Sequence, residues 1–212
     1  MKNRMFLFIK RGFDILASLI ALIILSIPML ITAILIKIED GEPVIYKQIR
    51  MGKNLKPFYI YKFRTMKTQR KELKSELTHD QMVTKVGKIL RATSIDELPQ
   101  LINILKGEMS FVGPRPWIAE YYEWFTDEQK RRSDVRPGIT GLAAVKGRNG
   151  INIFKKINYD IEYVDNMSLW LDIKIFYWSI IAVFKKTNAE ISENGIKEEL
   201  DDLREHKESV HI

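Results

Sequence analysis

The sequence contains no cysteine among its 212 residues. That absence excludes a disulfide framework and any metal site built from cysteine ligands, and it is compatible with a reducing compartment. Acidic side chains are in the minority, since 27 Asp and Glu face 34 Lys and Arg. Residues 189–212 are acidic, so the rest of the chain carries a surplus of about 12 positive charges. Such a surplus suggests an anionic partner: nucleic acid, anionic lipid head groups or phosphorylated substrates.

Charge is also missing from the run Ile15 to Ile36. A helix of these 22 residues would be about 33 Å long, enough to cross a bilayer. Pro28 predicts a kink inside the run, and Ser26 can bond a freed backbone group. Basic residues flank both ends, so the positive-inside rule assigns no orientation. The residues leave two arrangements open: a single span, and a helix that bends at Pro28 and returns to the same face.

Residues 43–64 predict a β-hairpin. Two runs of β-branched and aromatic residues, 44–49 and 58–63, flank a Gly-Lys-Asn turn at 52–54. Alternation along the second run places Lys62 at the end of an apolar face. The polar segment 67–88 that follows is predicted to be a mobile connection.

Asp96 and Glu97 open an amphipathic segment that ends at Gly107. Because a helical proline is tolerated only in the first turn, Pro99 predicts that Asp96 is the N-cap or first helical residue. Carboxylates at that end stay ionised beside backbone N–H groups that can bind an anion, and an ionised Asp there could attack phosphorus. Asp is also a favoured N-cap, so a purely structural role stays open. The predicted apolar face has helical spacing: Leu98, Leu101, Ile102 and Leu105.

Two later segments carry cations. Prolines on both sides of Arg115 stiffen its backbone, which suits either a phosphate clamp or a tight turn with a solvated arginine. Residues 136–150 combine several glycines with Arg136, Lys146 and Arg148. Glycine lets backbone approach a ligand closely and cations neutralise phosphate, although the segment matches neither a dinucleotide fingerprint nor a P-loop.

Three segments remain. Residues 117–132 predict an aromatic-rich helix that ends in three cations and suits either a membrane interface or the core. Residues 169–184 predict an amphipathic helix on a membrane or on the core, because Asp172 and Lys174 argue against a second span. The tail after Lys186 is predicted to be solvated and partly disordered.

The ordered set of motifs resembles the bacterial sugar transferase family, specifically its small monotopic phosphoglycosyl transferases. The likeness runs from about Lys10 to Lys186. It rests on Lys10-Arg11 with Phe13-Asp14, the Ser26 and Pro28 kink, Tyr61-Lys62-Phe63-Arg64-Thr65-Met66, Thr93-Ser94-Ile95-Asp96-Glu97-Leu98-Pro99-Gln100, Lys106-Gly107-Glu108-Met109-Ser110, Gly113-Pro114-Arg115-Pro116 and Arg136-Pro137-Gly138-Ile139-Thr140-Gly141.

The resemblance implies an α+β, predominantly helical fold, with a re-entrant membrane helix kinked at Pro28, a small β-hairpin and amphipathic interfacial helices around the active site. It thereby favours re-entry over spanning. The implied organisation is a membrane anchor at 1–37, a catalytic domain at 38–186 and an acidic tail at 187–212. The implied location is the bacterial inner membrane, with the active site on its cytoplasmic face.

The resemblance also implies a reaction. A sugar-1-phosphate would pass from a UDP-sugar to undecaprenyl phosphate, giving undecaprenyl-diphosphate-sugar and UMP, with Mg²⁺ as cofactor. This step would begin a lipid-linked glycan. The implied partners are these two substrates and membrane lipids, with no nucleic acid, and a homo-oligomer is left open.

Residue by residue, Asp96 matches the family nucleophile and Glu97 the second member of the dyad, and both are expected to hold the metal. Lys62 and Arg115 match basic positions near the phosphates. Arg136 and Arg148 are expected to contact substrate. Ala144 stands where the family usually has glutamine, which leaves the identity of the sugar open.

Two other interpretations stay open at this point. Asp96 could hold Mg²⁺ while the lipid phosphate attacks the donor directly, without a covalent intermediate. The chain could also be a membrane-anchored basic module that binds polyprenyl phosphate, a protein or nucleic acid without catalysis.

Overall fold

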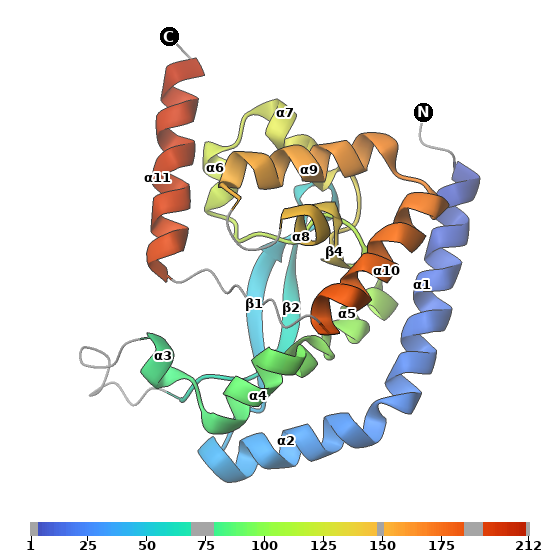
Figure 1. Ribbon diagram of the computed structural model, residues 1–212, viewed down its shortest axis with the longest axis vertical. Helices are drawn as coiled ribbons and strands as arrows, with labels where there is room; N and C mark the ends of the chain where they lie inside the picture. Colours follow the sequence, from blue (N-terminus) through green and yellow to red (C-terminus); the bar gives the residue numbers. More distant parts are fainter. Residues whose placement is uncertain (1–3, 69–78, 148–150, 185–192, 211–212) are drawn as a thin grey trace.

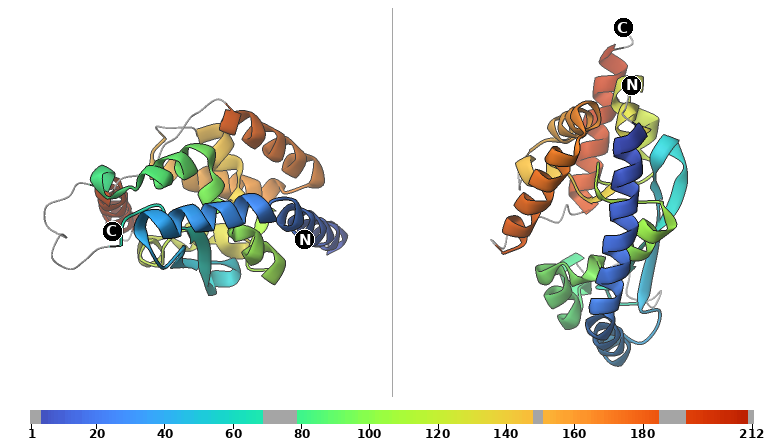
Figure 2. Two further views of the ribbon diagram at one scale, coloured as in Figure 1. Left: turned by 90° about the horizontal axis from the view of Figure 1, so that it is seen from below. Right: turned by 90° about the vertical axis from the view of Figure 1, so that its right-hand side faces the viewer.

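The computed structural model describes residues 4–68, 79–147, 151–184 and 193–210. Its described part is mostly helical and contains two small two-stranded sheets, which confirms the predicted α+β class. Helices pack against one face of the hairpin of the first sheet and leave its other face open, and the N-terminal helix pair runs along the outside of the molecule (Figures 1 and 2).

The N-terminal pair consists of α1, Arg4–Ile24, and α2, Ser26–Asp40, bent by 61° at the break between them. Pro28 lies in the first turn of α2, where its ring and missing N–H disturb the preceding turn. Ser26 Oγ donates to the carbonyl of Ile23 at 2.7 Å, as the kink prediction requires. Among the described residues, neither helix alone has the length and hydropathy to cross a bilayer, whereas the bent pair has both.

One face of α1 is polar and fixes the helix to the rest of the chain. Asp14, only 2 % exposed, accepts from Ser110 Oγ at 3.0 Å and from the backbone of Phe111 at 3.1 Å. Arg11 donates to two carbonyls at the C-terminal end of α5, Gln100–Lys106, at 2.6 and 2.8 Å. The opposite face exposes large apolar side chains, among them Phe8 and Leu16. The contacts of Asp14 and Arg11 therefore tie α1 to the domain that carries Asp96 and Glu97.

The predicted hairpin is confirmed. Strands β1, Ile45–Met51, and β2, Pro57–Phe63, pair antiparallel, with a short 3₁₀ turn, Lys53–Leu55, between them. Phe58 and Ile60 are buried against α5, Gln100–Lys106. These contacts place the outer end of β2, where Lys62 lies, beside the segment that precedes α5.

The second sheet pairs β3, Ser110–Val112, with β4, Gly138–Thr140, in parallel. Its glycines permit close approach of backbone to backbone. A Cβ atom on Gly138 would lie 2.2 Å from the nitrogen of Gly113, and one on Gly141 would lie 2.3 Å from the Gly113 oxygen. Close packing against the loop after β3 thus accounts for glycine at 138 and 141, and the ligand contact that the sequence suggested stays a prediction.

The segment predicted as a mobile connection, 67–88, contains helical structure where it is described. It includes α3, His79–Met82, and the start of α4, Lys85–Thr93. Thr84 caps α4 by accepting from the backbone of Gly87 at 2.8 Å. Leu90 of α4 packs with Ile36 of α2 in one apolar cluster. The polar composition of the segment concealed this short apolar face, so the prediction of an unstructured connection was wrong for its second half.

The prediction of a single aromatic helix at 117–132 is also wrong. The chain forms α6, Tyr121–Trp124, then α7, Asp127–Lys130, then a 3₁₀ turn, Arg131–Asp134. Thr126 and Gln129 make a capping box that starts α7. Tyr121 and Phe125 are 5 % and 0 % exposed, so the core alternative is confirmed and the membrane-interface alternative fails for them.

The remaining helices are α8, Leu142–Gly147, α9, Ile153–Asn166, α10, Leu169–Phe184, and α11, Glu193–Val210. The predicted bounds of α10 are confirmed, and Trp170 and Tyr177 on it are mostly exposed. The tail after Lys186 was predicted to be solvated and partly disordered; its residues 193–210 form α11, and residues 187–192 and 211–212 lie outside the described residues. Leu203 of α11 is fully buried in a cluster with Tyr121, and Glu199 accepts from the Tyr121 hydroxyl at 2.8 Å.

Candidate active site

Asp96 and Glu97 lie in a 3₁₀ turn, Ile95–Glu97, one turn before α5 begins at Gln100. The predicted N-cap at Asp96 is therefore wrong, because Pro99 occupies that position. Pro99 has no N–H to bond the carbonyl of Ile95, and Leu98 N bonds it instead at 3.1 Å. The dyad is thus held by tight turns rather than at the start of the α-helix.

The buried face of α5 is rotated from the one predicted. Leu101 is buried as expected, but Ile102 is 40 % exposed. Asn103 and Ile104 are fully buried instead. Gly107 ends the helix in the left-handed conformation, with φ 82°, which confirms the predicted stop.

Glu97 is the centre of the charged cluster. Lys62 Nζ lies 2.7 Å and Arg115 Nη2 lies 3.0 Å from the same Glu97 Oε1 atom. Burial alone would raise the pKa of Glu97, but the charges and hydrogen bonds of Arg115 and Lys62 outweigh it and lower that pKa to about 2. Glu97 is consequently an ionised carboxylate shared by two cations, with a side chain that is 17 % exposed.

Lys62 reaches the dyad because the hairpin is pinned to α5 by Asn103. The Asn103 side chain accepts from the backbone of Tyr61 at 3.1 Å and donates to the carbonyl of Tyr59 at 2.7 Å. These bonds satisfy backbone groups on β2 that the two-stranded sheet leaves open. The cation at the end of β2 is therefore fixed relative to the turn that carries Glu97.

Arg115 reaches the dyad from the loop after β3. The backbone of Gly113 donates to the carbonyl of Thr140 at 2.9 Å, and Gly138 donates to that of Pro114 at 2.9 Å. The Arg115 side chain itself is 56 % exposed. A rigid backbone thus presents a solvent-accessible guanidinium to Glu97.

Asp96 directly precedes Glu97 in the same 3₁₀ turn and is 8 % exposed. The described residues contain no group of three or more His, Cys, Asp or Glu side chains that could enclose a metal ion. The two carboxylates do fit Mg²⁺, which is commonly held by one or two protein carboxylates together with water and substrate phosphates. The donor set thus suits an ion shared with a phosphorylated ligand.

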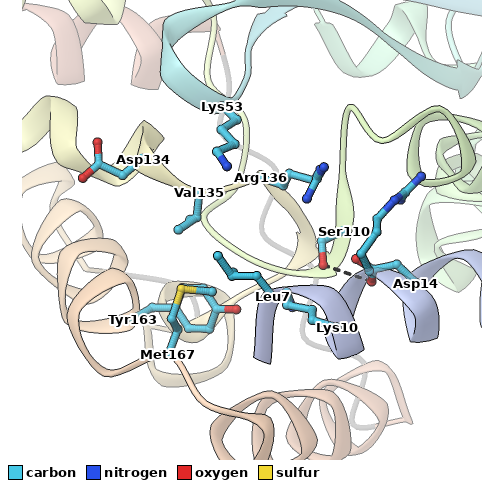
Figure 3. Close-up of a pocket in the computed structure, with 11 residues that line it drawn as sticks. Leu7, Lys10, Asp14, Lys53, Ser110, Asp134, Val135, Arg136, Tyr163 and Met167 are labelled. Carbon is cyan, nitrogen blue, oxygen red and sulfur yellow. Dashed lines mark hydrogen bonds between the residues drawn. The ribbon is translucent and has the colours of Figure 1, made fainter. Parts of the chain in front are cut away.

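Arg136 lies apart from the dyad. Its Nε donates to the carbonyl of Gly107 at 2.8 Å, at the far end of α5. It lines a cavity of about 120 Å³ together with Arg11 and Lys53 (Figure 3), and neither dyad carboxylate lines that cavity. Arg148 lies outside the described residues. The structure therefore brings together three of the predicted site residues, Glu97, Lys62 and Arg115, with Asp96 next to Glu97 in the chain, and places Arg136 elsewhere.

Sequence reasoning missed the residues that hold this cluster in place. Asn103 stands on a helix whose apolar spacing was judged from its leucines and isoleucines alone. Arg132 was noted only as one of the three cations that end the predicted helix 117–132, and the structure buries it fully. A polar residue inside an otherwise apolar helical face was the one available signal for Asn103.

A model of the family described as bacterial sugar transferase matches residues 5–186. The chain belongs to the bacterial sugar transferase family. This sugar transferase is 47 % identical over 168 residues to the uncharacterized sugar transferase EpsL of Bacillus subtilis, covering 79 % of this chain and 83 % of EpsL.

Two further relatives of the sugar transferase carry more specific names. It is 44 % identical over 181 residues to a UDP-N-acetylgalactosamine-undecaprenyl-phosphate N-acetylgalactosaminephosphotransferase of Aeromonas hydrophila, covering 82 % of this chain and 43 % of the relative. It is 38 % identical over 199 residues to an undecaprenyl-phosphate galactose phosphotransferase of Salmonella typhimurium, covering 86 % and 42 %. The chain thus spans most of EpsL but less than half of these two longer proteins.

Proposed function

We propose that this sugar transferase moves a sugar-1-phosphate from a UDP-sugar to undecaprenyl phosphate through a covalent intermediate on Asp96. The observation that carries the proposal is the cluster beside Asp96, in which Lys62 and Arg115 share one oxygen of Glu97. Two relatives are named for transfer of a phosphosugar to undecaprenyl phosphate. The product would be an undecaprenyl-diphosphate-sugar, the first lipid-linked species of a glycan.

In the first half-reaction, a carboxylate oxygen of Asp96 attacks the phosphorus that bears the sugar. The new bond joins Asp96 to that phosphorus, and the bond from the phosphorus to the UMP oxygen breaks, so UMP leaves. In the second half-reaction, a phosphate oxygen of the lipid attacks the same phosphorus and the Asp96 carboxylate leaves. Each step exchanges one oxygen for another at phosphorus, so the enzyme ends unchanged.

Both half-reactions bring anions together, and the cations of the cluster reduce that repulsion. Lys62 and Arg115 lie beside the dyad and would stabilise charge that develops on the phosphoryl oxygens. Asp96 and Glu97 would hold Mg²⁺, which supplies further neutralisation of the phosphates when it is bound. Removing one such cationic donor from an active site typically lowers turnover by ~10²–10³.

The lipid acceptor is confined to a membrane, so we place the site at the bilayer surface. The bent pair α1 and α2 supports a re-entrant anchor by its length, composition and 61° bend. Exposed apolar side chains on α1, α2 and α10 support contact with lipid. The proposal locates the catalytic domain on the cytoplasmic face of the inner membrane.

The deciding experiment mixes enzyme, Mg²⁺ and a panel of UDP-sugars without lipid acceptor and measures UMP. The panel includes UDP-N-acetylgalactosamine, UDP-galactose and UDP-glucose. Covalent transfer predicts about one UMP per enzyme with the true donor, and steady turnover once undecaprenyl phosphate is added. Direct attack by the lipid phosphate predicts no UMP until the acceptor is present.

Asp96→Asn should remove both the single UMP and the steady turnover. Asp127→Asn is a matched control, because Asp127 lies on α7 with a fully exposed side chain. Retained turnover in Asp96→Asn would exclude the covalent step. Undiminished binding of undecaprenyl phosphate with no UMP from any donor would favour a binding module.

A further inference from the structure

Arg132 is a buried cation with no part in the scheme above. Its side chain is 1 % exposed and lies in the 3₁₀ turn after α7. Its Nη2 and Nε atoms donate to Asp160 Oδ2 at 2.5 and 3.0 Å. Its Nη1 atom donates to the hydroxyl of Tyr122 at 2.8 Å, and its guanidinium lies 4.2 Å from the ring centroid of Trp117.

The Arg132 guanidinium makes one more bond, and that bond leads to the site. Nη2 also donates to the backbone carbonyl of Arg115 at 2.7 Å. The prolines at 114 and 116 already restrict the backbone of Arg115. With Gly138 N bonded to the carbonyl of Pro114, the main chain on both sides of the Arg115 Cα atom is fixed.

Stability alone does not account for a charged pair at this place. Arg132 and Asp160 are both about 2 % exposed, and Asp160 Oδ1 has no hydrogen-bond partner within the described structure. Well-packed apolar side chains of similar volume are often as stabilising as such a buried pair. They would not supply a planar fork that bonds Asp160 and the Arg115 carbonyl at once.

We infer that Arg132, held by Asp160, is a positioning residue that fixes Arg115 in the orientation in which it meets Glu97. The kinetic consequences of this inference rest on the proposed function. The contact between Arg115 and Glu97 rests on the geometry alone. Arg132 acts through its bond to the backbone of Arg115 and not through contact with substrate.

A double-mutant cycle with Arg132→Lys and Arg115→Ala tests the inference. Lysine keeps the charge opposite Asp160 but lacks the fork that reaches the Arg115 carbonyl. We expect Arg132→Lys alone to lower kcat/KM for the donor by ~10–100-fold, as displacement of a site group does. In the Arg115→Ala background the same change should cost less than about threefold. Losses that multiply across the two backgrounds would overturn the inference.

A second measurement does not depend on turnover. The ¹⁵N NMR signals of the Arg115 guanidinium report whether it is bonded to Glu97. They should shift in Arg132→Lys toward their positions in Glu97→Gln, and unshifted signals would overturn the inference even in an inactive protein. Absence of UMP from wild-type enzyme would instead count against the proposed function.

Controls separate positioning from loss of the fold. Arg131→Lys changes the neighbouring, more exposed arginine, which pairs with Glu128 and Asp165, and should leave both readouts unchanged. If Arg132→Lys does not fold, Tyr122→Phe replaces it in both experiments, because it removes one acceptor of Arg132 and keeps the ion pair. We expect Tyr122→Phe to lower kcat/KM for the donor by less than Arg132→Lys, and again only when Arg115 is present.

Discussion

At the scale of single residues, the site depends on one carboxylate that two cations keep ionised. Glu97 receives Lys62 and Arg115 on one oxygen, and its pKa is lowered to about 2. Sequence spacing could not have predicted this, because Lys62, Glu97 and Arg115 lie on three separate elements. The resemblance to a known family supplied Lys62 and Arg115 as basic positions near the phosphates. The contact with Glu97 became visible only in the fold.

The lowered pKa of Glu97 predicts a pH-dependent stability. A folded-state pKa below the ordinary 4.5 adds stability above pH 4.5, and that stability is lost as pH falls from about 4.5 to about 2. The contribution at neutral pH is roughly 3 kcal/mol. Glu97→Gln should remove it, so the variant should lose less stability than the wild type over that pH range.

Urea unfolding at pH 7, 4.5 and 3 in the same detergent measures this difference. Glu42→Gln serves as the control, because Glu42 pairs with Lys37 on an exposed surface. Parallel pH dependence of the unfolding free energy in wild type and Glu97→Gln would contradict the assignment of the low pKa to Glu97.

Arg136 shows the limit of residue-level reasoning. A cation among glycines predicted a substrate contact, and that contact stays a prediction, while the structure shows Arg136 donating to the Gly107 carbonyl at the C-terminal end of α5. Composition identifies which side chains can bind phosphate. It does not show which of them already donate hydrogen bonds to backbone carbonyls. Positive charge at a helix C-terminus is favourable for structural reasons alone.

At the scale of elements, strong local signals were predicted and weak ones were not. The hairpin has two β-rich runs around a turn, and α10 has a long apolar pattern, and both were found with nearly the observed bounds. Helices of four residues, such as α6 and α7, are too short to show a period. Helix α11 was missed because its apolar residues are few, although Leu203 is fully buried.

The Asn103 side chain of α5 holds the backbone of β2 through two hydrogen bonds. Asn103→Ala removes the partners of the Tyr61 N–H and the Tyr59 carbonyl and leaves both without their bonds. We expect a loss of about 2–4 kcal/mol in unfolding free energy, because each buried polar group left unpaired costs roughly 1–3 kcal/mol. Urea unfolding measures it, with Lys62 displaced from Glu97 as the functional consequence.

Asn166→Ala is the matched control. Its side chain is exposed and donates to the carbonyl of Glu162 one turn back on α9. A loss in Asn103→Ala no larger than in Asn166→Ala would show that the hairpin is held to α5 by apolar packing alone.

At the scale of the whole molecule, the proposed function makes the bent helix pair the element that would set how the catalytic domain meets the bilayer. The polar face of α1 binds the domain through Asp14 and Arg11, and its other face is apolar and exposed. An anchor fixed in this way would hold the dyad at a constant height relative to the lipid. The bend lies at Leu25, close to the kink that Pro28 predicted.

The absence of cysteine makes the topology directly testable. The single substitutions Arg4→Cys and Lys37→Cys lie near the two ends of the bent pair, and Leu16→Cys lies on its exposed apolar face. Re-entry predicts that a membrane-impermeant maleimide labels the two flanking positions from the cytoplasmic side only, and leaves position 16 unlabelled. Labelling of positions 4 and 37 from opposite sides would show a span.

The proposed reaction depends on a transient bond between Asp96 and the phosphosugar. The intact mass of the enzyme after mixing with its donor and Mg²⁺, without lipid, detects that bond. We predict an added mass of one phosphosugar, located on Asp96 by peptide mapping, absent in Asp96→Asn and lost when undecaprenyl phosphate is added. An unmodified mass under conditions in which the complete reaction turns over would contradict it.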